Sequence, residues 1–109
     1  MWIMTTFGFF SVVEKPWDRE KGTLTVRARV REDIDSLRDR FLPELTDMTE
    51  SGNADYRFRA QVPRQALAAA MSRIVGDVDY DNFKNAVARE QGHRRAGVYG
   101  SVWANLSGL

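Results

Sequence analysis

Residues 23–31, TLTVRARVR, decide the fold more than any other stretch of this sequence. Polar and apolar side chains alternate there without interruption, and a period of two is the mark of a half-buried β-strand. The apolar set, expected to face a core, is Leu24, Val26, Ala28 and Val30. Residues 55–62, DYRFRAQV, alternate in the same way and predict a second strand with Tyr56, Phe58, Ala60 and Val62 inside.

The flanking segments supply one more strand and the helices. Residues 2–14 are rich in aromatic and β-branched side chains, which favours a strand that Gly8 bends or splits. From Glu32 to about Leu42 the apolar period lengthens to that of a helix, and Thr46–Asn53 reads as a loop. Three further helices are predicted, over residues 64–75, 83–91 and about 93–106.

These elements predict an α+β fold in the order β-β-α-β-α-α-α, forming one globular domain over residues 1–109. A right-handed crossover after the second strand gives a three-stranded antiparallel sheet, order 2-1-3, with helices packed on one face. Positions on the apolar stripes predict the core. They are Leu24, Val26, Phe58, Leu67, Met71, Ile74, Phe83 and Trp103.

Composition excludes several kinds of chemistry. The chain has no cysteine, which removes disulfides, thiol nucleophiles and cysteine-ligated metals, and it has one histidine, His93. No glycine-rich phosphate loop, G-x-S-x-G elbow or H-E-x-x-H motif occurs. The start of the chain does not read as a signal peptide, and no apolar run could span a bilayer, so we expect a cytoplasmic protein. We therefore predict a non-enzymatic protein without a cofactor or a metal.

Arginine marks the outward face of the predicted sheet. Arginines two apart on a strand project from the same face about 7 Å apart, and their guanidinium groups match phosphate and carboxylate. With Phe7, Phe9 or Phe10 of the first strand beside them, such a face would suit single-stranded nucleic acid. One alternative is an acidic protein partner. The other is a solvated face, or a face covered by the C-terminal helix, with its arginines paired with Glu14, Asp18, Glu20 and Asp55. The candidate binding residues are Arg27, Arg29, Arg31, Arg57 and Arg59.

Other candidates carry weaker signals. Trp17 lies in a charged loop where burial is difficult, so it is a possible interface anchor. The acids of residues 77–81 resemble the start of an EF-hand loop, but Asn82 and Ala88 stand where that loop needs Gly and Glu, and helix capping explains the acids without a metal. A modest basic patch comprises Lys84, Arg89, His93, Arg94 and Arg95.

Five motifs spread over most of the chain carry a resemblance. They are MWIMTTFGFFSVVEKP at the start, LTVRAR, DYRFRAQVP, DVDYDNFK and VYGSVW near the end. Together they resemble a group of small, uncharacterised bacterial and phage-associated proteins. The resemblance implies a self-contained small domain, and it brings no assigned activity and no catalytic or binding residue.

The sequence thus favours a small binding or regulatory domain that acts through a protein partner, because a net charge of +1 lacks the basic excess of typical nucleic-acid-binding domains. The alternative is single-stranded nucleic-acid binding on the arginine-lined sheet face. A hydrolase or nuclease built from carboxylates and arginine is a third class. The partner and the oligomeric state stay open.

Overall fold

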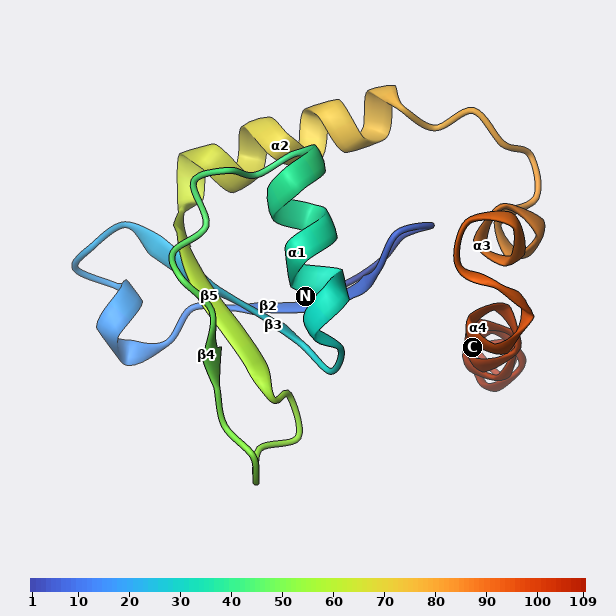
Figure 1. Cartoon of the computed structure of the whole chain (residues 1–109), viewed down its shortest axis with the longest axis horizontal. Coiled ribbons are helices and arrows are strands. Elements are labelled where there is room, and N and C mark those ends of the chain that lie inside the picture. The colour runs from blue at the N-terminus through green and yellow to red at the C-terminus, as the bar shows by residue number, and fades with distance from the viewer. The chain divides into compact units, whose positions relative to one another are not determined.

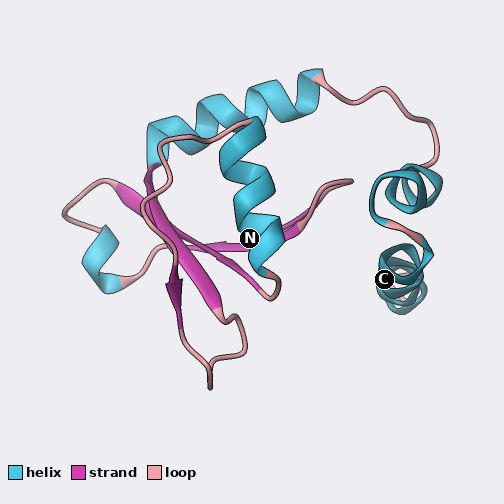
Figure 2. Cartoon of the chain, in the orientation of Figure 1, coloured by secondary structure: helices cyan, strands magenta, loops and turns pink.

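Five antiparallel strands form the sheet of this α+β protein, whose computed structural model describes residues 1–109 (Figures 1 and 2). The strands are β1 (Trp2–Met4), β2 (Phe9–Val13), β3 (Thr23–Ala28), β4 (Thr49–Glu50) and β5 (Phe58–Pro63). Their order across the sheet is β1-β2-β3-β5-β4. The helices are a short 3₁₀ turn η1 (Pro16–Asp18), α1 (Arg31–Arg40), α2 (Arg64–Gly76), α3 (Phe83–Gln91) and α4 (His93–Leu106).

The predicted three-stranded sheet of order 2-1-3 is wrong. The strands of residues 23–28 and 58–63 pair directly, with Val26 opposite Ala60, so β3 lies at the centre of the sheet. The crossover rule applies to parallel strands, and β3 and β5 are antiparallel, so the rule could not fix their order. The predicted loop over Thr46–Asn53 contains a further strand, β4, which pairs with β5.

Contacts within the chain divide it into two compact units. The first unit comprises Met1–Met4 and Gly8–Val78, and the second comprises Thr5–Phe7 and Asp79–Leu109. The whole sheet, η1, α1 and α2 belong to the first unit.

One face of the sheet is apolar and carries α1 and α2 (Figure 1). The two helices contact β5, and α1 also contacts β3. Strand alternation sends one apolar set toward them, and the helical stripes complete the core. Side chains buried there include Phe10, Val12, Val26, Ala28, Ala60 and Val62 from the strands, and Ile34, Leu37, Leu67 and Ala70 from the helices.

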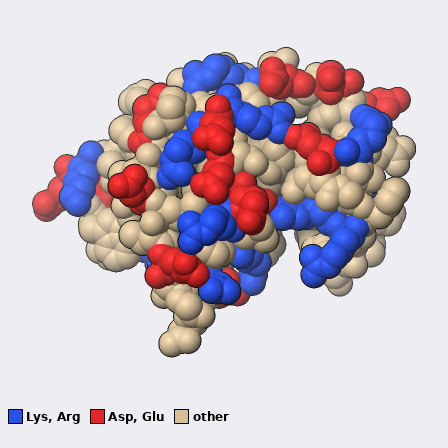
Figure 3. Space-filling model, in the orientation of Figure 1, with Lys and Arg blue, Asp and Glu red and all other residues tan.

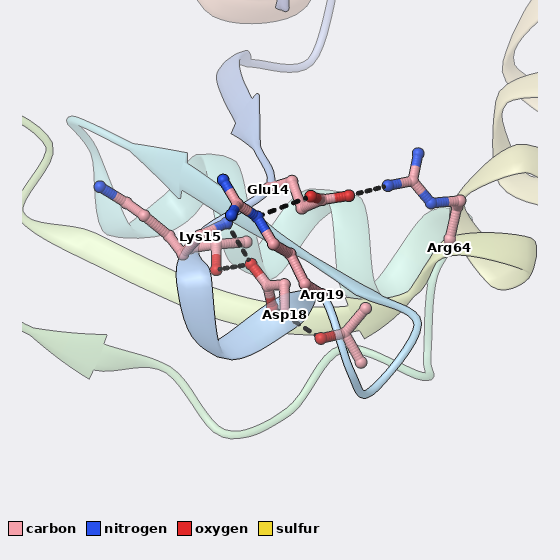
Figure 4. A network of polar contacts seen from close by, with 7 residues as sticks. Glu14, Lys15, Asp18, Arg19 and Arg64 are labelled. Atoms are coloured by element: carbon pink, nitrogen blue, oxygen red, sulfur yellow. Dashed lines mark hydrogen bonds and ion pairs between the residues drawn. The ribbon is translucent and has the colours of Figure 1, made fainter.

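The opposite face is polar, and the loop around η1 covers one end of it. Asp18, fully buried, accepts hydrogen bonds from the hydroxyls of Thr23 (2.6 Å) and Thr25 (2.8 Å) and from the Lys15 amide (2.8 Å). Figure 4 shows this carboxylate turned inward beneath η1. On the outside of the same loop, Glu14 forms ion pairs with Arg19 and Arg64 (Figure 4).

Gly8 divides the predicted first strand into β1 and β2. A Cβ atom at this position would lie 2.7 Å from Phe10 Cζ and 3.0 Å from Asp33 Cβ, so no side chain fits without a shift of buried neighbours. Asp33, at the start of α1, is buried and accepts a hydrogen bond from the Phe9 amide at 3.0 Å. The chain thus enters β2 against the N-terminal turn of α1.

The second unit is built on a helical hairpin. Gly92, with φ of +95°, joins α3 to α4 in a backbone conformation that favours glycine. The rings of Phe83 and Tyr99 stack with their centroids 5.8 Å apart and their planes 2° apart. Gln91 donates a hydrogen bond to the Thr6 carbonyl at 2.6 Å, which ties the Thr5–Phe7 segment to α3.

The predicted core residues have three outcomes. Val26, Phe58 and Leu67 are buried, as predicted. Leu24, Met71, Ile74 and Phe83 are half-buried. The prediction that Trp103 is buried is wrong, because its side chain is 68% exposed. It shares a stripe of α4 with buried Tyr99, but the indole lies beside the Lys84 ammonium, 5.6 Å from Nζ, and α3 does not enclose it.

Candidate ligand-binding face of the sheet

A row of five side chains crosses the polar face, one from each strand. Consecutive Cα partners link Trp2 to Ser11, Ser11 to Arg27, Arg27 to Arg59 and Arg59 to Thr49. Directly opposed residues of an antiparallel sheet project from the same face, and neighbouring strands lie about 4.8 Å apart. We call this set the transverse row. It places an indole, a hydroxyl, two guanidinium groups and a second hydroxyl side by side.

The centre of the transverse row is a pair of arginines without a carboxylate. Arg27 donates to Ser11 Oγ at 2.7 Å, and its buried Nε has no hydrogen-bond partner within the chain. Arg59 uses its Nε on the Tyr56 carbonyl at 3.1 Å. Neither side chain forms an ion pair, although both are only half-buried. Like charges directly opposed in a sheet repel, so this pair favours an anion between or above its members.

Three aromatic rings continue the surface beside the arginines. Trp2 and Phe9 meet edge to face with centroids 5.7 Å apart, and Phe9 lies 6.5 Å from Tyr56. The guanidinium carbons of Arg27 and Arg29 both lie 4.7 Å from the centre of the Tyr56 ring. Trp2 is 68% exposed, Phe9 is half-buried and Tyr56 is buried. The buried Tyr56 ring therefore adjoins two cations, and Phe9 links it to the exposed ring of Trp2.

Tyr56 is buried, as predicted, but its ring does not lie on the Phe58 side of β5. Strand β5 begins only at Phe58, so residues 55–57 do not follow its alternation. The Tyr56 ring instead contacts Phe9 and the two arginines. Of the three aromatic candidates from the first strand, Phe9 shares the face of Ser11 two residues on, Phe10 is in the core and Phe7 belongs to the second unit.

Arg29 is committed to an acidic partner. It forms a two-pronged ion pair with Asp55, at 2.6 and 3.2 Å, and half of its side chain is exposed. Hydrogen bonds to Asp55 raise the pKa of the Arg29 guanidinium further above its ordinary value, so this group stays charged. Because Asp55 already neutralises it, Arg29 offers less to an external anion than Arg27 or Arg59.

Arg31 and Arg57 form a separate cluster. The prediction placed Arg31 on a strand, but β3 ends at Ala28 and Arg31 begins α1. Its Nη2 lies 3.0 Å from one oxygen of Glu50, and Arg57 Nη2 lies 2.8 Å from the other. Both guanidinium groups also lie over the Phe58 ring. The five arginines thus divide into Arg27, Arg29 and Arg59 on the polar face and a Glu50-bridged pair elsewhere.

The wrong strand order also changes the expected distance between Arg27 and Arg59. With the first strand between them, Arg27 and Arg59 would stand about 10 Å apart. In the structure they are direct partners on adjacent strands, so their side chains can reach a common ligand. Acidic and basic groups are interspersed over the face of the molecule shown in Figure 3.

The remaining candidates are not members of the transverse row. Trp17 is 49% exposed on η1, with the Lys15 ammonium 6.0 Å from its ring centre. His93 is exposed at the start of α4, in the second unit. No group of three or more His, Asp or Glu side chains is arranged to hold a metal ion. None of the helices combines the length and apolar character that crossing a bilayer requires.

Sequence reasoning missed Trp2, Ser11 and Thr49 as members of the site. Their signal is the register, because Ser11 and Thr49 are Cα partners of Arg27 and Arg59, and Trp2 is the Cα partner of Ser11. No protein-family model, no curated protein and no solved structure matches this chain.

Proposed function

We propose that this protein is a non-enzymatic binding domain whose ligand is single-stranded nucleic acid, held on the transverse row and on the aromatic rings beside it. The observation that carries the proposal is the direct pairing of Arg27 with Arg59, without any carboxylate, on the sheet face that also carries the exposed ring of Trp2. The planar guanidinium group matches the geometry of phosphate, which every nucleotide of a strand carries. Bases stack on aromatic side chains.

The aromatic side chains favour a single strand over a duplex. A base offers its flat face to a protein only when it is unstacked from its neighbours, as in single strands and loops. Trp2 is mostly exposed and its edge contact with Phe9 supports the indole from one side. Base stacking on an aromatic side chain contributes about 1–3 kcal/mol per base, whichever base is present.

The proposal needs no basic field over the whole molecule. The net charge is +1, but Arg27 and Arg59 are the unpaired cations of the polar face, whereas Arg29 is paired with Asp55. A site that touches so few phosphates gives moderate affinity and a shallow salt dependence. A site of this kind is suited to binding a few nucleotides of a single strand rather than to coating a long polymer.

Binding to a short labelled oligothymidylate, measured by fluorescence anisotropy at several salt concentrations, tests the proposal. Arg27→Ala combined with Arg59→Ala should weaken binding at least tenfold and reduce the salt slope by about 0.7 for each phosphate that the variant no longer neutralises. The matched control is Arg19→Ala with Arg64→Ala, which removes the same charge from two arginines that already share Glu14. Equal weakening by both double variants would refute a site on the transverse row.

A protein partner is the second candidate, favoured by Trp17. This ring is 49% exposed on η1, and exposed tryptophans are frequent anchors of protein interfaces. Under this alternative, a partner recovered with the native protein after nuclease treatment is lost from Trp17→Ala and retained by Arg27→Ala. The nucleic-acid proposal expects the reverse dependence for the bound strand.

A further inference from the structure

We infer that Arg27 and Arg59 together hold a single oxyanion, one phosphate group of the bound strand, rather than one phosphate each. This inference rests on the proposed function and specifies its anchoring step. The two residues are Cα partners on β3 and β5, so their side chains leave the sheet at the same level and on the same face.

Hydrogen bonds within the protein anchor both guanidinium groups, and this favours the binding of one phosphate by the two together. Ser11 Oγ holds Arg27 through Nη2, and the Tyr56 carbonyl holds Arg59 through Nε. Arg27 is also held against the Tyr56 ring at 4.7 Å. Each guanidinium keeps donors beyond these interactions, because an arginine has five N–H groups. Two anchored forks that start from adjacent strands converge on one tetrahedral anion more readily than on two separated ones.

The same arrangement costs stability when no anion is bound. Two residues of like charge are direct Cα partners, and the buried Nε of Arg27 is left without a partner within the chain. If Arg27 served only for packing, an uncharged side chain of similar length would avoid both the charge repulsion and the unpaired buried N–H group. We therefore expect an anion to stabilise the fold through this pair, and we expect Arg27→Met to remove the dependence without unfolding the protein.

Thermal unfolding in inorganic phosphate, compared with potassium chloride of equal ionic strength, tests the inference. Phosphate at about ten times its dissociation constant should raise the unfolding midpoint by several degrees in the native chain. The same rise is expected for Arg19→Met with Arg64→Met, which corrects for general effects of phosphate on protein surfaces. Arg27→Met and Arg59→Met should each lose most of the rise, and the double variant should lose no more than either single one.

The outcomes separate the inference from the proposed function. A phosphate effect that persists in both single variants, or that is lost additively, overturns the shared site. Oligothymidylate binding that depends on Arg27 and Arg59 without any Arg27-dependent phosphate effect leaves the proposed function standing and overturns the single-anion site.

An Arg27-dependent phosphate effect without oligothymidylate binding supports the anion site and overturns the proposed function. If Arg27→Met lowers the unfolding midpoint in chloride more than Arg59→Met does, and phosphate restores neither, Arg27 is structural and the inference is overturned.

Discussion

The buried carboxylate of Asp18 holds the η1 loop against one end of the polar face. Burial raises the pKa of this carboxyl, but hydrogen bonds from the Thr23 hydroxyl, the Lys15 amide and the Thr25 hydroxyl, with the charge of Lys21, hold the pKa below its ordinary value. The carboxylate therefore links η1 to β3 in its charged form, and it stabilises the fold through that form.

Asp18→Asn should lower the free energy of unfolding at pH 7 by about 2–3 kcal/mol, because an amide cannot accept all three hydrogen bonds of a charged group. A lowered pKa contributes stability above the ordinary aspartate pKa, and the contribution is lost as the pH falls through the folded-state value. Urea unfolding at several pH values should show the native chain and the variant converging below about pH 4. A difference that stays constant down to about pH 2 would contradict this role.

Gly8 is a second position at which we expect a single substitution to destabilise the fold. A Cβ atom there would meet Phe10 Cζ at 2.7 Å, and Phe10 is 1% exposed, so its ring has nowhere to move. Gly8→Ala should cost about 1–3 kcal/mol, the range for overpacking a core. Gly52→Ala is the control, because nothing lies within 4 Å of its Cβ position. Equal unfolding midpoints for the two variants in urea would mean that the backbone at Gly8 relaxes freely.

At the scale of elements, the sequence predicts each long strand and helix but not the sheet. Alternation at residues 23–31 and 55–62 locates β3 and β5, because a period of two depends only on local pattern. Strand order depends on pairing between distant segments, which a local pattern does not show. The edge strand β4 was missed because its two residues are too few to show any period. The backbone of Thr46 and Gln61 further joins that segment to β5.

The same distinction explains how much of the candidate site could be predicted. Alternation places Arg27 and Arg59 on the outward face of their strands, as the register confirms. It fails for Arg31 and for Tyr56, which lie just outside β3 and β5, where the period of two no longer applies. Trp2 and Ser11 enter the site only through sheet register, which a local pattern does not contain.

Two aromatic truncations test the assignment of core and surface. Phe58→Ala should lower the free energy of unfolding by about 3–5 kcal/mol, since Phe58 is buried opposite Ala28 on the helix-covered face. Trp103→Ala should cost less than about 1 kcal/mol, because the indole is 68% exposed. Chemical denaturation of both variants measures these costs. A loss for Trp103→Ala as large as that for Phe58→Ala would place this ring in a core after all.

At the scale of the whole molecule, a net charge of +1 and interspersed acids leave no long-range field to attract duplex DNA (Figure 3). Binding should then depend on Arg27, Arg59 and the exposed ring of Trp2. We expect a single strand to bind roughly 5-fold to 150-fold more tightly than a duplex of the same length, the factor that one stacked base of about 1–3 kcal/mol provides. Competition titrations measure the ratio, and equal affinities would exclude stacking on Trp2.

The fluorescence of Trp2 tests the central claim most directly. The chain has three tryptophans, and all are exposed, so Trp17→Phe with Trp103→Phe leaves Trp2 as the one indole. Adding oligothymidylate should quench this emission in a saturable way, because a base stacks on the ring. A companion protein with Trp2→Phe and Trp103→Phe, which keeps Trp17, should show no quenching. Quenching of Trp17 and not of Trp2 would contradict binding on the transverse row.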